Sequence, residues 1–415
     1  MTRRLEPALL PFMLLLLILP FPGTVALRLL CLAAAFAYAV YAWKRLAVPP
    51  LPLKGVLGVW VLVVLASLFY SVDPAYSLGE IKNELGYTMM AFVAFFVVTT
   101  SEERLKAMLL ALAAGAVGLC VSALAARFFL DEWDDVSRHG GTASFATYLA
   151  AAVPAIMFLG LYFEKARLQK LSLALIGLLL VTGIFSQQRI IWPVLLIQAC
   201  AAIVLYGRAV GIRVSRLAGV LAIVSAAILL ALAFTQFNRF KSRDIVQFDL
   251  IERDRVVQHA APSAKMQNDD RLVFWPKVVR KIAERPFIGA GFGRRAMSKA
   301  YPELIPSENP LLWHAHNLVL NYGISMGIPG MLVILLLFGA LGWQYLKFCR
   351  ASNRRLKLLG VCGIALVLGV FARNMVNDLF LRDGALLFWA LNGSFLGLGL
   401  RLMAAEPARE ADAHA

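Results

Sequence analysis

Long apolar segments separated by short polar connections recur along the whole sequence. A helix needs about 20 apolar residues to cross a bilayer, and it satisfies its own backbone polar groups in lipid. The ~10-residue alternating segments of a transmembrane β-barrel are not visible. The pattern therefore predicts an all-α fold, a polytopic transmembrane bundle of about twelve helices. The predicted spans lie near residues 7–22, 24–43, 54–71, 85–100, 105–129, 142–163, 170–186, 190–206, 215–235, 317–346, 356–373 and 384–402.

One polar interruption breaks this rhythm. Between the apolar run that ends near Phe234 and the run that begins near Leu318, roughly eighty residues lack a spanning segment. We expect this insert to form a large, partly helical loop between the ninth and tenth spans and to supply most of any chemistry. The predicted domains are residues 1–237 with spans one to nine, 238–316 as the loop domain, 317–403 with spans ten to twelve, and 404–415 as a disordered tail.

An amphipathic helix is predicted inside the insert, where Arg271 begins it and Pro286 ends it. Its apolar stripe comprises Leu272, Trp275, Val278, Val279 and Ile282, while Lys277, Arg280, Lys281 and Arg285 point elsewhere. Such a helix either lies on the outer leaflet with its basic face toward lipid phosphates, or packs on the bundle with that face solvated.

The charges of the chain follow its connections. The sequence is 60% hydrophobic and 16% charged, with a formal net charge of +16, and the basic residues concentrate in alternate connections. By the positive-inside rule those connections and both termini are cytoplasmic, and the insert lies on the outer side. Charge confined to connections argues against a nucleic-acid partner. The N-terminal run 8–21 has no cleavage site after it, so it is interpreted as the first span and not as a signal peptide.

Polar groups at the outer ends of spans are the first candidates for chemistry, because a charge exposed to lipid is costly. Gln188 and Arg189 stand between two spans with almost no loop, and Arg271 follows Asp269 and Asp270. Each arginine either aims into a cavity to hold an anion or has a plainer role. The plain role is snorkelling to headgroups for Arg189 and a local ion pair for Arg271.

A glycine-spaced turn follows the predicted loop helix, with Gly289, Gly291 and Gly293 at alternate positions. Such spacing lets backbone N–H groups approach a phosphate closely. Turns of this kind beside a membrane are also common without any ligand, so both interpretations stay open.

Two of the five histidines crowd into the end of the insert, at His314 and His316, and Asn317 follows them. Imidazole accepts a proton near neutral pH, so a general base is the functional interpretation and a hydrogen-bonded packing residue is the plain one. Histidines at i and i+2 diverge on a helix and no carboxylate has convincing spacing, so we predict no metal ion at this pair. The acidic run 131–135 is either a solvated outer loop or a site for a divalent cation. The five cysteines show neither disulfide nor metal-site spacing, which predicts plain packing residues.

These motifs resemble the signature of a known family. His316 and Asn317, nine further residues and then Gly327-Ile328-Pro329-Gly330 resemble the H(N/S/Q)-x9-GxxG signature of the O-antigen ligase family. The stretch 285–293 is similar to the Pro-x-x-Gly-x-Gly segment of that family. The resemblance implies a GT-C-like glycosyltransferase with about twelve spans, cytoplasmic termini and one large periplasmic loop between the ninth and tenth spans.

The resemblance also implies an activity. Such enzymes transfer O-antigen polysaccharide from undecaprenyl pyrophosphate to a sugar of the lipid A core, at the periplasmic face of the inner membrane of Gram-negative bacteria. The implied partners are this lipid-linked donor, the lipid A-core acceptor and the membrane lipids. The implied reaction is a direct inverting displacement that uses no metal and no cofactor.

Roles for individual residues follow from the same resemblance. His316 is expected to be the general base, with His314 as the second choice or as a group that orients the acceptor. Arg189, Arg271 and the three glycines of the turn are expected to bind the donor pyrophosphate. Supporting roles are expected for Gln188, Asn317 and Asp378, with Asp378 or Asp383 orienting the histidine. One departure is Pro193, which stands where the family often has a leucine.

Three other functions fit the same sequence features. An O-antigen polymerase shares the lipid-linked donor but extends another lipid-linked glycan, and a protein O-oligosaccharyltransferase is usually longer in its periplasmic region. A lipid or solute transporter belongs to a different class and should show inverted repeats with polar sites near the bilayer midplane. No convincing repeat is visible, and the polar candidates lie near the outer surface.

Overall fold

The computed structural model describes residues 6–130, 141–209, 214–241, 251–252, 255–256, 270–307, 309 and 312–413. This part of the chain is helical apart from one short antiparallel pair, in which β1 (Ile251–Glu252) lies against β2 (Arg255–Val256). The all-α prediction is thereby confirmed for the described residues. The acidic run 131–135 and Asp269 fall outside them.

The helices of the structure follow the predicted spans closely. They are α1 (Leu10–Ile18), α2 (Val25–Ala42), α3 (Lys54–Ala66), α4 (Pro74–Glu80), α5 (Tyr87–Val98), α6 (Glu102–Ala125), α8 (Gly141–Tyr162), α9 (Ala166–Phe185), α10 (Ile191–Ala209), α11 (Val214–Lys241), α12 (Asp270–Glu284), α13 (Arg295–Ala300), α14 (Leu318–Arg350), α15 (Arg354–Asn374) and α16 (Arg382–Ala413). A π-helical turn, η4 (Ile81–Gly86), joins α4 to α5 without a break.

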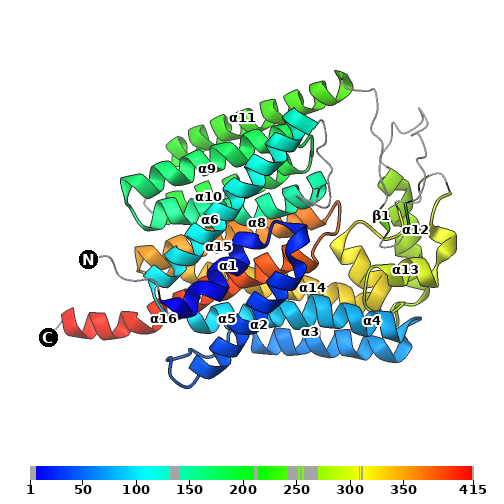
Figure 1. The fold of residues 1–415 in the computed structure, drawn as a ribbon, viewed down its shortest axis with the longest axis horizontal. Coiled ribbons are helices and arrows are strands. Elements are labelled where there is room, and N and C mark those ends of the chain that lie inside the picture. The colour runs from blue at the N-terminus through cyan, green and yellow to red at the C-terminus, as the bar shows by residue number, and fades with distance from the viewer. Residues whose placement is uncertain are drawn as a thin grey trace.

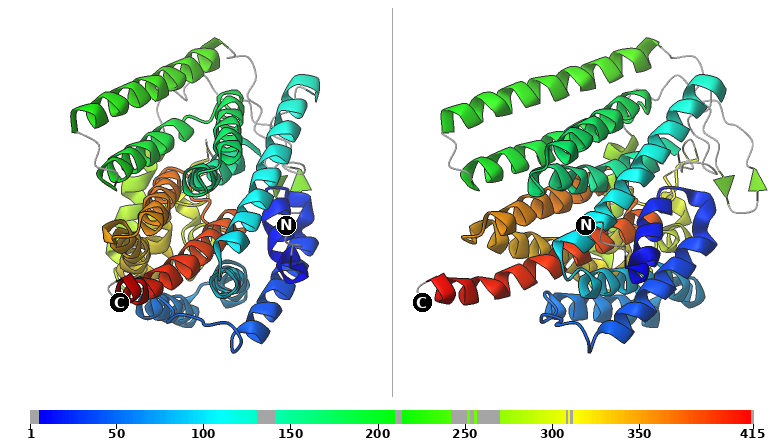
Figure 2. Two further views of the ribbon diagram at one scale, coloured as in Figure 1. Left: turned by 90° about the vertical axis from the view of Figure 1, so that its left-hand side faces the viewer. Right: turned by 60° about the vertical axis from the view of Figure 1, so that its left-hand side comes forward.

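The bundle has two distinct ends. Figure 1 shows the long helices side by side, with the chain's N- and C-terminal ends at one end of the bundle and β1, α12 and α13 at the other. We call the latter the loop end. The two views of Figure 2 show α11 along one edge of the bundle. This arrangement places both termini at the end opposite the insert, as the pattern of basic connections predicts.

Nine helices of the described chain are long and apolar enough to cross a membrane. Three shorter apolar helices, Pro7–Ile18, Lys54–Tyr70 and Ala218–Phe234, coincide with three further predicted spans. The first ends early because Pro20 and Pro22 follow it, and the residue before a proline disfavours helix. A multi-pass helical fold is therefore established, while the number twelve stays a prediction.

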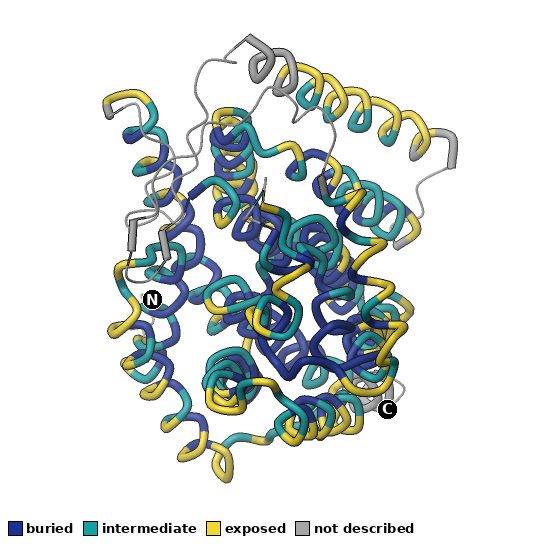
Figure 3. Tube along the Cα trace, turned by 90° about the vertical axis from the view of Figure 1, so that its right-hand side faces the viewer, coloured by how far each residue is buried: buried dark blue, intermediate teal, exposed yellow. Residues whose placement is uncertain are grey.

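The core lies where helices approach one another closely. On α16, a side chain at Gly393 or Gly397 would collide with the backbone of Phe92 or Phe96 on α5, so these two helices pack backbone to backbone. The indoles of Trp60 and Trp389 stack nearby, with their ring centroids 5.7 Å apart. Figure 3 shows the same organisation, with buried residues along the centre of the bundle and exposed residues on its outer helices.

Two elements differ in part from the expectation. Helix α12 occurs where predicted, but only part of its apolar stripe is buried. Val278 and Ile282 are buried against the bundle, whereas Leu272 and Val279 are exposed. At the C-terminus α16 continues to Ala413, through most of the tail that was expected to be disordered from residue 404. Alanine, the strongest helix former, accounts for half of residues 404–413.

Candidate active site

A break in α14 shapes the loop end. Gly327 has φ 69° and ψ −163°, which interrupts the helix at its tenth residue. In a regular helix the carbonyl of Ser325 would accept from the N–H of residue 329, but Pro329 has no N–H to donate. The N–H of Ile328 donates instead to the carbonyl of Pro286 at 2.6 Å, so the carbonyl of Ile324 also loses its helical partner.

The glycine turn after α12 fills this gap. The N–H of Ala290 donates to the Ile324 carbonyl and that of Gly291 donates to the Ser325 carbonyl, both at 2.9 Å. A Cβ at Gly289 would collide with the backbone of Ser325, and Gly291 has φ +102°. The two glycine motifs of the sequence are thus one structural unit, in which the turn completes the hydrogen bonding of the broken helix.

The glycines of the turn therefore have a packing role, in addition to the phosphate-binding role that the sequence predicts for them. Gly293 has φ +112°, and a side chain there would meet Tyr76 and Glu80 on α4. The N–H of Gly291 is already engaged with Ser325. Phosphate binding by Gly289, Gly291 and Gly293 stays a prediction.

His314 is buried at the end of the insert, 3% exposed. Its Nδ1 accepts from the backbone N–H of His316 at 3.1 Å and faces the Asn321 amide nitrogen at 3.4 Å. Burial lowers the pKa of the His314 imidazole well below its ordinary value, and the neighbouring His316, Arg294 and Arg271 lower it further. His314 is therefore neutral near pH 7.

His316 lies beside it in an unusual backbone conformation, with φ +50°. The two imidazole rings stack with their centroids 3.8 Å apart. The Nδ1 of His316 is 3.1 Å from Oδ1 of Asn377, a residue that sequence reasoning missed. Asn317 begins α14 as its N-cap, because its Oδ1 accepts from the N–H of Leu320 at 3.0 Å.

The connection between α15 and α16 closes over these residues. Four successive residues of this connection each bond a different side chain of the insert or of α14. The contacts are Met375 carbonyl with Asn317 Nδ2, Val376 carbonyl with the Arg271 guanidinium, Asn377 Oδ1 with His316 Nδ1, and Asp378 carbonyl with the Arg294 guanidinium. Arg271, His316, Asn317 and Asp378 are thus brought together.

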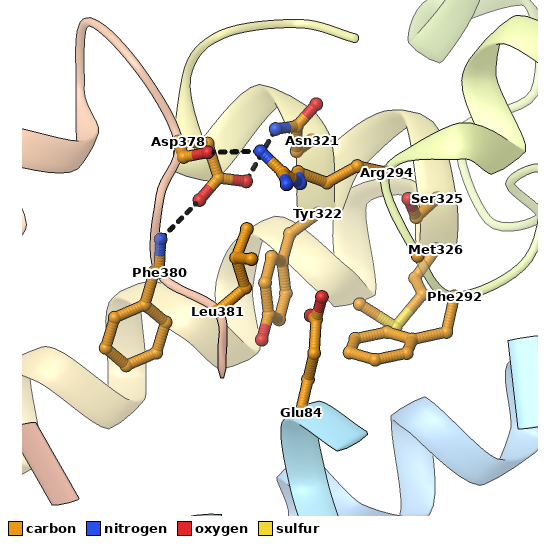
Figure 4. Close-up of a pocket in the computed structure, with 11 residues that line it drawn as sticks. Glu84, Phe292, Arg294, Asn321, Tyr322, Ser325, Met326, Asp378, Phe380 and Leu381 are labelled. Atoms are coloured by element: carbon orange, nitrogen blue, oxygen red, sulfur yellow. Dashed lines mark hydrogen bonds between the residues drawn. The ribbon is translucent and has the colours of Figure 1, made fainter. Parts of the chain in front are cut away.

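The Asp378 carboxylate supports the other histidine. Its Oδ2 accepts from Asn321 at 2.6 Å and its Oδ1 from the N–H of Phe380 at 3.1 Å, as Figure 4 shows. Asn321 in turn accepts from the N–H of Ala315 at 2.8 Å and faces His314. Asp378 therefore acts on His314 through Asn321. Asp383, the other carboxylate considered for orienting a histidine, is ion-paired with Arg28.

A narrow polar cavity, with room for about one water molecule, adjoins this network. Glu84, Arg294, Asn321, Tyr322 and Asp378 contribute its polar lining. Figure 4 shows the Glu84 carboxylate pointing into the cavity from below, with Arg294 on the opposite side. Glu84 belongs to the π-helical turn η4, and such turns often occur at functional sites. A carboxylate at the edge of a predicted span was the signal that could have identified it.

Gln188 and Arg189 lie in the turn between α9 and α10. Gln188 Nε2 donates to Thr142 at the start of α8 at 2.7 Å, whereas the Arg189 side chain is exposed. The next residue of α8, Ala143, accepts from the buried Arg373 at 2.9 Å, and Arg373 also donates to the carbonyl of Asn377 at 3.2 Å. The α9–α10 turn is thus joined to the histidine loop through α8 and Arg373, although no described contact brings Arg189 itself to the histidines.

The charges at the loop end suit an anion. Arg271 and Arg294 both contact the α15–α16 connection beside the histidine pair. The guanidinium of Arg294 also lies over the Trp313 ring, 5.3 Å from its centroid. Within the described residues, no group of three His, Cys, Asp or Glu side chains could hold a metal ion. All five cysteines are free and lie within helices, as predicted.

Comparison with known proteins places the site in a family context. No curated protein matches the chain. A family model described as O-antigen ligase matches residues 174–335, which run from within α9 to within α14 and include Arg189, Arg271, the glycine turn and both histidines. The resemblance noted from the histidine and glycine motifs is thereby confirmed: residues 174–335 match the O-antigen ligase family model.

Proposed function

We propose that the protein is an O-antigen ligase, which transfers O-antigen polysaccharide from undecaprenyl pyrophosphate to a sugar of the lipid A core. One observation carries the proposal: the family-matched segment contains a histidine pair whose stacked rings lie beside two arginines at the loop end, Arg271 and Arg294. The reaction belongs to the periplasmic face of the bacterial inner membrane, since the loop end lies opposite the basic, cytoplasmic connections.

The general base is His316. The Nδ1 of His314 accepts from a backbone N–H, so its proton sits on Nε2 and neither nitrogen takes another proton easily. For His316, Oδ1 of Asn377 accepts from Nδ1, which leaves the lone pair on Nε2. His316 then removes the proton of the acceptor hydroxyl, a contribution of about 10²–10⁴-fold in rate. The neutral His314 orients its ring and the acceptor.

The leaving group needs positive charge more than a proton. Undecaprenyl pyrophosphate is a weak base, so cations that face its oxygens stabilise the transition state. Arg271 bonds the Val376 carbonyl beside His316, and its guanidinium carries five N–H donors in a fork that matches phosphate oxygens. Arg189 contributes from the α9–α10 turn, and the glycine turn approaches from the loop. Direct attack inverts the anomeric centre, and no step calls for a metal.

The product distinguishes this proposal from its closest alternative. In a deletion strain, lipopolysaccharide with a complete core and no polymer supports the ligase. A core that carries a single repeat unit supports an O-antigen polymerase instead. Complementation of this strain with the His316→Ala variant should give no transfer of polymer. The control variant His414→Ala, a histidine near the C-terminus, should restore transfer. Normal transfer by His316→Ala would contradict the role of His316 as the general base.

A further inference from the structure

We infer that Asn377 is the positioning residue for His316, and that Arg373 holds Asn377 in place. The inference rests on the proposed role of His316 as the base. It adds two residues outside the family-matched segment that prepare the imidazole for proton transfer: Arg373 in the last turn of α15, and Asn377 on the connection that follows.

The contact between Asn377 and His316 sets the tautomer. An amide oxygen only accepts hydrogen bonds, so Nδ1 of His316, 3.1 Å from Oδ1 of Asn377, must carry the proton. A neutral imidazole has one N–H, and the second nitrogen is therefore the acceptor. Asn377 thus directs the basic lone pair to Nε2, on the far side of the ring from the α15–α16 connection.

Two constraints together define the ring. Stacking on His314 at 3.8 Å sets its plane, and the bond to Asn377 sets its rotation within that plane. The left-handed φ of +50° at His316 is costly for a residue with a side chain, so surrounding contacts must hold it. The amide of Asn377 is one of these contacts.

The choice of an amide matters for the charge of the base. The neighbouring carboxylate of Asp378 points away from His316, toward Asn321 and the N–H of Phe380. A carboxylate at position 377 would favour the imidazolium and raise the pKa of His316. A neutral amide orients the ring without that effect.

Arg373 explains why the connection holds its shape. Its side chain is 1% exposed, and it donates to the carbonyls of Asn377 at 3.2 Å and of Ala143 at 2.9 Å. Burying a cation is costly unless its donors are satisfied. Two of the three guanidinium nitrogens have these carbonyl partners, while Nε is buried with no hydrogen-bond partner among the described residues. The two bonds join the start of α8 to the backbone of Asn377, and they hold the Asn377 amide beside the imidazole of His316.

The test is the pH dependence of transfer by the purified full chain, with lipid-linked polysaccharide as donor and core lipopolysaccharide without O-antigen as acceptor. Asn377→Asp should shift the acid limb of kcat to higher pH by about one unit, because the new carboxylate stabilises the imidazolium. Asn377→Ala should lower kcat about 10- to 100-fold with unchanged KM for both substrates. Asn377→Gln, which keeps an amide oxygen, should recover part of the loss.

Asn353→Asp is the matched control, because it adds the same charge at the N-cap of α15, far from the loop end. Its acid limb should coincide with that of the wild type. The inference is overturned if folded Asn377→Asp shows the same acid limb of kcat as the wild type, or if Asn377→Ala has the kcat of the wild type. If the wild-type product is instead an extended lipid-linked glycan, the ligase proposal fails. The same pH shift measured on that product still supports the role of Asn377.

Discussion

Hydrogen-bond chemistry at single residues separates the two histidines. They are close in the sequence and similar in chemistry, yet their Nδ1 atoms have opposite roles: that of His314 accepts from a backbone N–H, and that of His316 donates to Asn377. In the proposed reaction this difference makes the His314 ring a fixed neutral donor and the His316 ring the base. A spacing of two residues could not reveal it, because the partners Asn321 and Asn377 come from elsewhere in the chain.

The depressed pKa of His314 predicts a pH-dependent stability. Its pKa lies well below the ordinary value of 6.5 when the protein is folded. As pH falls below 6.5 the unfolded chain binds a proton that the folded protein does not, so stability is lost by up to about 1.4 kcal/mol per pH unit. Thermal unfolding at pH 7.5 and 5.5 should show a smaller difference for His314→Asn than for the wild type. Equal differences would contradict a buried neutral imidazole.

A second prediction at this scale concerns the phosphate ligands. Arg271→Ala should weaken binding of the lipid pyrophosphate, and Arg271→Lys should recover only part of it, because a point charge cannot form the bidentate contact of a guanidinium. Donor affinity measured with a fluorescent polyprenyl pyrophosphate gives the readout. Arg280, an exposed arginine on the same helix, provides the control: Arg280→Ala should bind as the wild type does. Unchanged affinity in Arg271→Ala would remove it from the site.

Among the elements, the broken helix α14 and the glycine turn form the unit that positions the histidines. The turn supplies two N–H groups to the carbonyls of Ile324 and Ser325, which receive none from Ile328 and Pro329 in the broken helix. A smaller apolar core, formed by Phe274, Val278, Met297, Ala315 and Ile324 with neighbouring residues, lies beneath α12 and anchors the segment between the histidines. The break in α14 and the packing of α12 thereby determine where the site lies.

Glycine substitutions test this unit. Gly289→Ala should lower the thermal stability of the protein, because its Cβ would collide with the Ser325 backbone on α14. Gly339→Ala, further along α14, has open space around it and should be neutral. A melting curve and the donor affinity should be measured together. Weaker donor binding at unchanged stability would instead favour direct contact between the turn and a phosphate.

On the scale of the whole molecule, the two ends of the bundle carry different sets of charged and polar residues. The end that holds the termini carries basic residues fixed by helix ends and acids: Arg401 donates to carbonyls at the end of α5, and Arg355 pairs with Glu102. The loop end carries the histidines, Arg271 and Arg294. Under the proposed function, substrates with lipid anchors therefore reach the site from one membrane surface only.

Labelling tests this orientation. In a cysteine-free background, Ser298→Cys on α13 at the loop end should react in intact cells with a maleimide that reaches the periplasm but does not cross the inner membrane. Ser101→Cys, at the start of α6, should react only after the inner membrane is opened. The reverse pattern would invert the proposed topology.

Most of the fold and part of the site could be predicted from sequence. Apolar runs predicted the long helices, since span length and helical hydrogen bonding are local properties. The histidine and glycine motifs predicted the family and placed His316, Asn317 and Arg271. Glu84 and Asn377 were missed because each lies far in sequence from the histidine motif, Glu84 in a helical turn and Asn377 in a connection. Neither a single glutamate nor a single asparagine is unusual by itself.

The sequence by itself determined the helical membrane fold and the position of the insert, and it predicted the type of chemistry at the end of the insert, because periodicity, charge and motif spacing are properties of the residue order. Only the tertiary structure decided which partner the Nδ1 atom of each histidine bonds, why the glycines are needed where they stand, and which side chains contact His316. These answers depend on hydrogen bonds between residues far apart in sequence, such as His316 with Asn377 and Gly291 with Ser325. A pattern along the chain does not specify the partners of such bonds.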